Sequence, residues 1–236
     1  MIHLALPPDD PQIRVVDSFE ALANAPFEDG VNGFCWPREL VGDFAEIVRL
    51  LGEGEGIVTL EEHRLAQLQA SPSGREAIEV LLEDQRRLLA RELDPALNLV
   101  YSALHDERSG PIATDVFSFH VDSAPVEAET WLCTYSGAPS EGLLNTQATR
   151  RVDHAETRAE LLRNYGGKDD AGFLAFLTEQ HYDLHYAPNP GAQPFCFGMG
   201  HLWRVAVDWP GSRVPPFIHR APAEHPGPSP RLLLIA

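Results

Sequence analysis

The feature that most constrains the fold is a change of hydrophobic pattern near residue 106 of this 236-residue chain. Before that point, apolar residues recur at three- and four-residue steps over 78–93, which is the spacing of an amphipathic helix. A shorter helix is predicted over 40–51. Ser73 and Glu76 have the spacing of a capping box, so they are predicted to begin the longest helix.

After residue 106, short runs of β-branched and aromatic residues bounded by Gly and Pro predict strands. The predicted strands cover 112–122, 130–135, 195–199, 203–208, 216–220 and 231–235. Two predicted helices, 155–165 and 171–181, form an insert at about 154–190. We therefore expect a single α+β domain, 1–236, with a mainly helical N-terminal region, 1–106. Its core, 107–236, is expected to be a double-stranded β-helix, the cupin-like jelly roll.

Composition narrows the classes of partner. A net charge of −17 repels phosphate backbones and argues against a nucleic-acid partner. No apolar run approaches the roughly 18 residues of a membrane span, and the first residues lack the basic leader of a secretory signal. Three widely spaced cysteines form neither a disulfide framework nor a metal clip. We therefore expect a cytoplasmic protein whose partner is a small-molecule substrate.

The most informative motif is His120-Val121-Asp122, which follows an apolar run. On a strand, residues two apart point to the same face, so His120 and Asp122 are expected to project together. His219 is the best candidate for a third ligand. Two histidines and one carboxylate form the facial triad of non-haem Fe(II) oxygenases, which leaves positions open for a 2-oxo acid chelate and O₂.

Three further residues are candidates for the co-substrate pocket. Arg231 follows the loop 221–230 and can return beside the strand of His219, where its planar fork would hold a carboxylate. Thr134 is a candidate second contact to that carboxylate, and Trp131 is a candidate pocket wall. Surface pairing for Arg231 and simple core packing for Trp131 are the competing interpretations.

In order along the chain, His120-x-Asp122, His219 and Arg231 resemble the HxD…H…R pattern of the Fe(II)/2-oxoglutarate-dependent dioxygenases. The resemblance implies a jelly roll, Fe(II) held by the triad, and 2-oxoglutarate anchored by Arg231. It also implies hydroxylation or desaturation of a small molecule, because halogenases of this superfamily replace the carboxylate that Asp122 supplies. It does not identify the substrate.

Roughly residues 95–236 also look like a narrower, uncharacterised bacterial domain family. Its members typically carry FHxD, CTYxGP, WPG, HRSP and RRLLL. The corresponding segments here are FHVD, WLCTYSG, DWPG, FIHRAP and PRLLLIA. The sequence departs from the family pattern at Ala221, where Ser is usual, and at Pro230, where a second Arg is usual. Neither departure falls on a proposed metal ligand.

Two other functions fit the same residues. Zinc or manganese in the triad would suit a cupin-type hydrolase or isomerase, since ligand type alone does not fix the metal. Alternatively, the HxD motif could be a structural hydrogen-bond pair in a non-catalytic, ligand-binding barrel. Elsewhere, His181 and His185 have the spacing of a zinc pair on a helix, although Pro188 and Pro190 favour a solvent-exposed pair.

Overall fold

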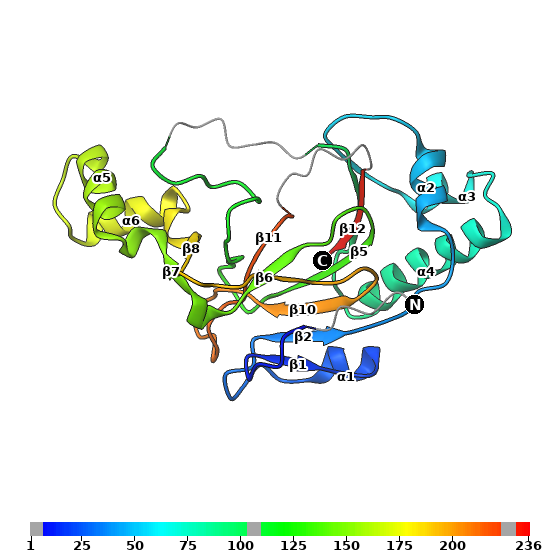
Figure 1. Ribbon diagram of the computed structural model, residues 1–236, viewed down its shortest axis with the longest axis horizontal. Coiled ribbons are helices and arrows are strands. Elements are labelled where there is room, and N and C mark those ends of the chain that lie inside the picture. The colour runs from blue at the N-terminus through cyan, green and yellow to red at the C-terminus, as the bar shows by residue number, and fades with distance from the viewer. Residues whose placement is uncertain (1–6, 103–109, 223–229) are drawn as a thin grey trace.

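The computed structural model describes residues 7–102, 110–222 and 230–236 (Figure 1). The fold mixes helices with a large, mainly antiparallel β-sheet; among the strands described in these ranges, only the β1–β2 pair of that sheet is parallel. In spatial order the seven strands are β1 (Ile13–Val15), β2 (Gly33–Trp36), β10 (Leu202–Ala206), β5 (Glu129–Ser136), β12 (Arg231–Ile235), β4 (Ala96–Val100) and β3 (Ile57–Thr59).

Shorter strands form a second layer. The small sheet has the order β11 (Ile218–Arg220), β6 (Glu141–Leu143) and β9 (Phe195–Cys196). A separate two-stranded ribbon pairs β7 (Ala148–Arg150) with β8 (Tyr186–Pro188). Within the described ranges, strand hydrogen bonds do not close the large and small sheets into a barrel, so the closed jelly roll expected from the sequence is not established.

Six α-helices are described. They are α1 (Phe19–Asn24), α2 (Phe44–Leu51), α3 (Glu62–Ala66), α4 (Pro72–Leu89), α5 (Ala155–Tyr165) and α6 (Ala171–Glu179). Short 3-10 turns cover Asn145–Gln147, Arg151–Asp153 and Tyr182–Leu184. Helices α5 and α6 lie at the opposite end of the molecule from α2, α3 and α4 (Figure 1). None of the described helices has both the length and the apolar character of a membrane span.

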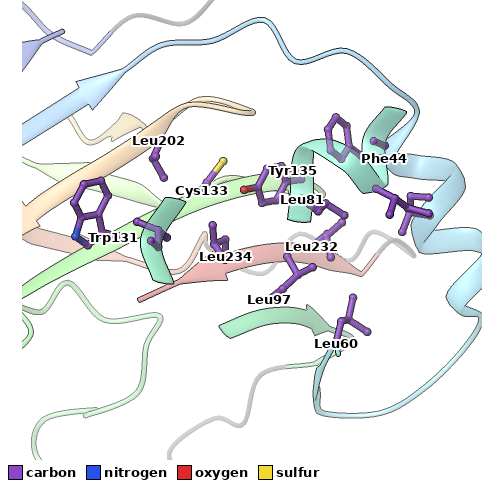
Figure 2. Close-up of a cluster of buried hydrophobic side chains, with 14 of the residues drawn as sticks. Phe44, Leu60, Leu81, Leu97, Trp131, Cys133, Tyr135, Leu202, Leu232 and Leu234 are labelled. Carbon is purple, nitrogen blue, oxygen red and sulfur yellow. The ribbon is translucent and has the colours of Figure 1, made fainter. Parts of the chain in front are cut away.

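The two faces of the large sheet bury different cores. Strand β5 illustrates the division, because Trp131, Cys133 and Tyr135 alternate with Leu132 along it. The first three side chains belong to one buried cluster with residues of α1, α2, α3 and α4. Figure 2 shows them beside Phe44 of α2 and Leu81 of α4. Leu132 packs on the other face with Phe217 and neighbouring aromatic side chains, between the large and small sheets. The large sheet is therefore sandwiched between a helical layer and the layer of short strands.

The N-terminal region differs from the expectation of helices alone. Its helices are present, but β1, β2, β3 and β4 also come from it and complete the large sheet. Three of these strands have three or four residues, too few for a two-residue periodicity to stand out from a helical pattern. The predicted boundary at residue 106 lies outside the described residues.

Two local predictions are corrected. Helix α4 begins at Pro72, and its N-cap is Ser71, whose hydroxyl accepts a hydrogen bond from the Gly74 amide. The predicted capping box at Ser73 is therefore wrong, because proline fixes the first helical turn two residues earlier. The segment 112–122 is not a continuous strand, although His120 forms isolated β-bridges.

Candidate metal centre

The backbone brings His120 directly opposite His219. The amide of each residue donates to the carbonyl of the other, both at 2.9 Å. This is a reciprocal antiparallel pair, so the two side chains project from the same face. On its other side the segment pairs with the insert: His120 bridges His185, and the Val121 amide donates to the Leu184 carbonyl at 3.0 Å. Three neighbouring backbone segments thus hold the site.

Asp122 completes a cluster with the two histidines, as the sequence predicted. Its Oδ1 lies 3.9 Å from His120 Nε2, and its Oδ2 lies 3.7 Å from His219 Nε2. One ligand atom from each of the three residues lies within 4.8 Å of the others. Ligands at right angles around one metal ion are about 3 Å apart, so small side-chain rotations would bring these atoms to coordinating distance. Two imidazoles and a carboxylate are also the donor set that Fe(II), Zn²⁺ or Mn²⁺ accepts.

The histidine tautomers favour coordination through Nε2. His120 Nδ1 lies 2.7 Å from the Ser118 carbonyl, and His219 Nδ1 lies 3.4 Å from the Phe217 carbonyl. A carbonyl can only accept, so a hydrogen bond to it places the imidazole proton on Nδ1. The lone pair is then on Nε2, facing Asp122, as in metal sites where a second contact orients the ligand.

Asp122 is itself held in place by two contacts. Thr130 Oγ1 donates to its Oδ2 at 2.6 Å, and the Asp208 amide donates to its backbone carbonyl at 2.8 Å. Thr130 lies near the start of β5, on the face that also carries Leu132. The sequence analysis did not identify Thr130. Its position in the same strand face as Thr134 is the signal that could have found it.

Burial and charge set the protonation states. Burial, followed by the neighbouring His219, lowers the pKa of His120 to about 4. Burial alone would raise the pKa of the Asp122 carboxyl, but His219, the Thr130 hydrogen bond and His120 together lower it. At neutral pH His120 is therefore uncharged and Asp122 is ionised. Their 3.9 Å contact is not an ion pair, and both groups are in the form that binds a cation.

A hollow of about 230 Å³ lies beside the cluster. Its lining residues come from the segment that carries the HxD motif and from the end of the insert. They are Thr114, Asp115, Val116, His120, Val121, Asp122, Ser123, His181, Leu184 and His185. The hollow is smaller than most small-molecule pockets, which run from about 300 to 1,000 Å³. A ligand that enters it would lie next to the candidate metal position.

Arg231 points toward the small sheet. Its Nε donates to the Ala138 carbonyl at 2.7 Å, and its Nη2 donates to Ser140 Oγ at 3.2 Å. Ser140 lies two residues before Gly142, and Gly142 pairs with His219. Two residues along a strand span about 7 Å. Burial lowers the pKa of Arg231 to about 10, so the guanidinium stays charged at neutral pH. Among the described residues, no carboxylate forms a salt bridge with it.

The other two pocket candidates lie on opposite faces of β5. Thr134 is buried on the face of Leu132, toward the small sheet, and pairs with Leu233 of β12. Trp131 is fully buried on the helical side, 5.8 Å from the Phe19 ring between ring centroids, as its place in Figure 2 illustrates. Trp131 therefore does not line the hollow beside the triad. The alternation of the strand points it into the helical core.

His185 is the residue that the sequence analysis misjudged. Helix α6 ends at Glu179, so His181 and His185 do not share a helical face. His181 is exposed, whereas His185 is only 4% exposed, and its ring centroid lies 5.8 Å from that of His120. The expected solvent-exposed pair is therefore wrong. Backbone pairing with His120 draws His185 inward, and no local pattern signals that pairing.

Comparison with known proteins adds no relative: no family model, no curated protein and no solved structure matches this chain.

Proposed function

We propose that this protein is a non-haem Fe(II)/2-oxoglutarate-dependent oxygenase that hydroxylates or desaturates a small molecule. The convergence of His120, Asp122 and His219 on one point carries the proposal. Their two uncharged imidazoles and one carboxylate are the facial triad of such enzymes. Fe(II) bound there with 2-oxoglutarate and O₂ would supply the oxidising power, with succinate and CO₂ as co-products.

Strand order supports a jelly roll as the finer description of the fold. The inner strands of the large sheet run β10-β5-β12-β4. The short strands run from the His120 segment to β11, β6 and β9. Two four-membered antiparallel layers facing each other, with the chain crossing between them, are the arrangement of a double-stranded jelly roll. In this description the metal ligands lie on the inner side of the shorter layer.

The chain's own residues have distinct roles in the proposed reaction. His120 and His219 would each present an Nε2 lone pair, and the Ser118 and Phe217 carbonyls keep the protons on Nδ1. Thr130 fixes the orientation of the Asp122 carboxylate. These contacts preorganise the ligand set, so that metal binding requires little rearrangement.

Arg231 is the proposed anchor for the far carboxylate of 2-oxoglutarate. A partly buried guanidinium that forms no salt bridge within the described ranges favours an anionic ligand, because an uncompensated buried charge is costly. Its present acceptors are a carbonyl and a hydroxyl. A carboxylate could accept two parallel hydrogen bonds from the guanidinium edge and add charge neutralisation. Thr134, on the same inner face, is a candidate second contact.

A cupin-type hydrolase or isomerase with zinc or manganese remains the second candidate, and a non-catalytic barrel the third. Binding measurements separate them. Anaerobic Fe(II) followed by 2-oxoglutarate should produce a visible charge-transfer absorption that requires both components. Asp122→Ala and His219→Ala should abolish it, while His63→Ala, an exposed histidine on α3, should leave it unchanged. Succinate formation under O₂ is the activity readout.

Each outcome of these binding measurements supports one of the three candidate functions. Iron binding without a response to 2-oxoglutarate would contradict the oxygenase and favour the hydrolase or isomerase. No metal binding at all would favour the barrel. With iron bound, Arg231→Gln should lower the affinity for 2-oxoglutarate at least tenfold, because a charged hydrogen-bond partner of the carboxylate is lost. Unchanged 2-oxoglutarate affinity in Arg231→Gln would remove that residue from the co-substrate site.

A further inference from the structure

A second hollow, of about 880 Å³, lies on the helical side of the large sheet. One wall is formed by residues 36–41, at the end of β2 and beyond it, and the other by residues of α4 between 76 and 87. At 1.5 Å per residue, that part of the helix is about 17 Å long. No residue of the triad lines this hollow. It is an elongated groove, here called the α4 groove, separate from the candidate metal centre.

Part of the α4 groove is apolar. Trp36, Leu40 and Val80 line it, are partly buried, and pack against the helical core. Val41 lines it too and is 65% exposed. A single exposed valine is ordinary, but one that shares a hollow with three other apolar residues adds to a common apolar surface. Contact with the apolar side chains of a partner would remove this surface from water and stabilise a complex.

The positive charges that line the groove already have partners. Arg38 Nη1 lies 2.8 Å from Asp84 Oδ1. Near the C-terminal end of α4, Arg86 and Arg87 both contact the carboxylate of Glu83, at 2.8 and 2.9 Å. Two arginines and one glutamate leave an excess of one positive charge at that end. A cationic group in the groove is therefore expected nearer the N-terminal end of α4.

The negative charges nearer that end are unpaired. Glu39, Glu76 and Glu79 line the groove and are exposed, and within the described ranges none of them forms a salt bridge. Glu76 and Glu79 are three residues apart on α4, so they project from the same side of the helix. Exposed ion pairs are individually weak, and a tight complex would need the apolar contact as well. The groove therefore combines an apolar surface with unpaired carboxylates, which complements a ligand that is both basic and apolar.

We propose that the α4 groove is a docking site for an extended segment of a partner protein in which basic and apolar residues alternate. Successive side chains of an extended segment point to opposite sides. Its lysines or arginines can then face Glu76 and Glu79 while its apolar side chains contact Trp36 and Val41. Five extended residues span about 17 Å, which is the length of α4 along the groove. This docking requires nothing from the metal centre.

Fluorescence anisotropy of labelled pentapeptides mixed with the full chain tests the proposal. The probe acetyl-KLKLK-amide has the expected pattern, acetyl-KSKSK-amide keeps only its charge, and acetyl-ELELE-amide reverses that charge. KLKLK should bind at least about fivefold more tightly than KSKSK, and ELELE should not bind. The double variant Glu76→Lys, Glu79→Lys should lower the affinity for KLKLK about tenfold, because attraction becomes repulsion. Val41→Ser should lower it about fivefold, because apolar contact is lost.

The matched control is the double variant Glu156→Lys, Glu160→Lys, which changes two exposed glutamates of α5 at the opposite end of the molecule. It alters the net charge by the same amount as the α4 variant, so at about 0.1 M salt it should leave the affinity for KLKLK unchanged within about twofold. An equal loss in both double variants would overturn the proposal, since net charge alone would then attract the peptide. So would the absence of KLKLK binding, KSKSK or spermine binding as tightly as KLKLK, or an unchanged affinity in Val41→Ser.

Discussion

Two buried polar clusters lie on opposite faces of the large sheet, and only one of them is complete. On the helical side, Arg38 Nη1 donates to Asp84 Oδ1 at 2.8 Å, and Tyr135 Oη donates to Asp84 Oδ2 at 2.7 Å. Arg38 Nε donates to the Gly200 carbonyl at 3.0 Å, and its Nη2 reaches the Cys133 sulfur at 3.4 Å. Every polar atom named here has a protein partner. These atoms therefore require no ligand or ion as a further partner.

The cluster of His120, Asp122 and His219 differs in that respect. No hydrogen bond among the described residues involves Nε2 of either histidine, and both atoms face one carboxylate. The protein satisfies Nδ1 of each ring and leaves the lone pairs converging. The contrast teaches that burial of charge alone does not mark a binding site. Convergent acceptors without a donor are groups that a cation would satisfy, which is the basis of the proposed metal centre.

The largest effect is expected where the complete cluster is broken. Asp84→Ala leaves the Arg38 guanidinium buried without its counterion and removes the acceptor of Tyr135. Loss of one partner of a buried ion pair typically costs about 3–5 kcal/mol. Urea unfolding should therefore show a loss of this size in the free energy of unfolding. Glu79→Ala, on an exposed part of the same helix, should change it by less than about 0.5 kcal/mol. If Asp84→Ala lowers the free energy of unfolding as little as Glu79→Ala does, the cluster around Asp84 does not stabilise the fold as described.

The second effect is a pH dependence from the incomplete cluster. His120 and His185 each have a folded-state pKa of about 4, against 6.5 ordinarily. Below pH 6.5 the unfolded chain takes up protons that the folded chain does not, so stability is lost as pH falls toward 4. The slope is at most about 1.4 kcal/mol per pH unit for each histidine. The lowered pKa of Asp122 acts in the same direction only below about pH 3.8, outside this window.

Urea unfolding at pH 7, 6 and 5 measures that slope. His120→Asn should make it shallower, since one titrating group is removed, whereas the exposed-histidine variant His63→Asn should keep it. A free energy of unfolding that stays constant between pH 6.5 and 4.5 would mean that the imidazoles are not buried as described.

The smallest effect on stability is expected at Thr130. Thr130→Val removes the 2.6 Å hydrogen bond to Asp122 and should cost about 1 kcal/mol of stability. Because this hydroxyl orients a proposed metal ligand, Zn²⁺ affinity measured by calorimetry should fall about 10- to 100-fold. Thr149→Val is the matched control, since its hydroxyl donates to Asn189 Oδ1 at 2.7 Å in the β7–β8 ribbon. Equal Zn²⁺ affinities in the two variants would remove Thr130 from the metal centre.

Local patterns predicted much of the regular structure. The helix predicted over 155–165 has the bounds of α5, and the strand predicted over 231–235 has those of β12. The spacing of His120 and Asp122, taken together with the later His219 and Arg231, was sufficient to nominate the cluster. These features succeed because helix periodicity, strand alternation and residue chemistry are properties of neighbouring positions.

The failures concern pairing between distant segments. The short strands β1, β2 and β3 exist because the large sheet extends to them, and their own sequences are too brief to show it. Trp131 and Thr134 could not be assigned to faces, because alternation separates two faces without saying what covers each. His185 was predicted to be solvent-exposed because Pro188 and Pro190 follow it closely, although the backbone of residue 120 pairs with it.

The sequence by itself therefore determined which side chains could bind a metal and which segments could be strands. Tertiary structure decided that His219 lies opposite His120, that Thr130 fixes Asp122, and that His185 lines the hollow beside them. The physical reason is that side-chain direction follows from local backbone geometry, whereas proximity across about a hundred residues depends on which strands pair, and pairing is settled by the packing of the whole core.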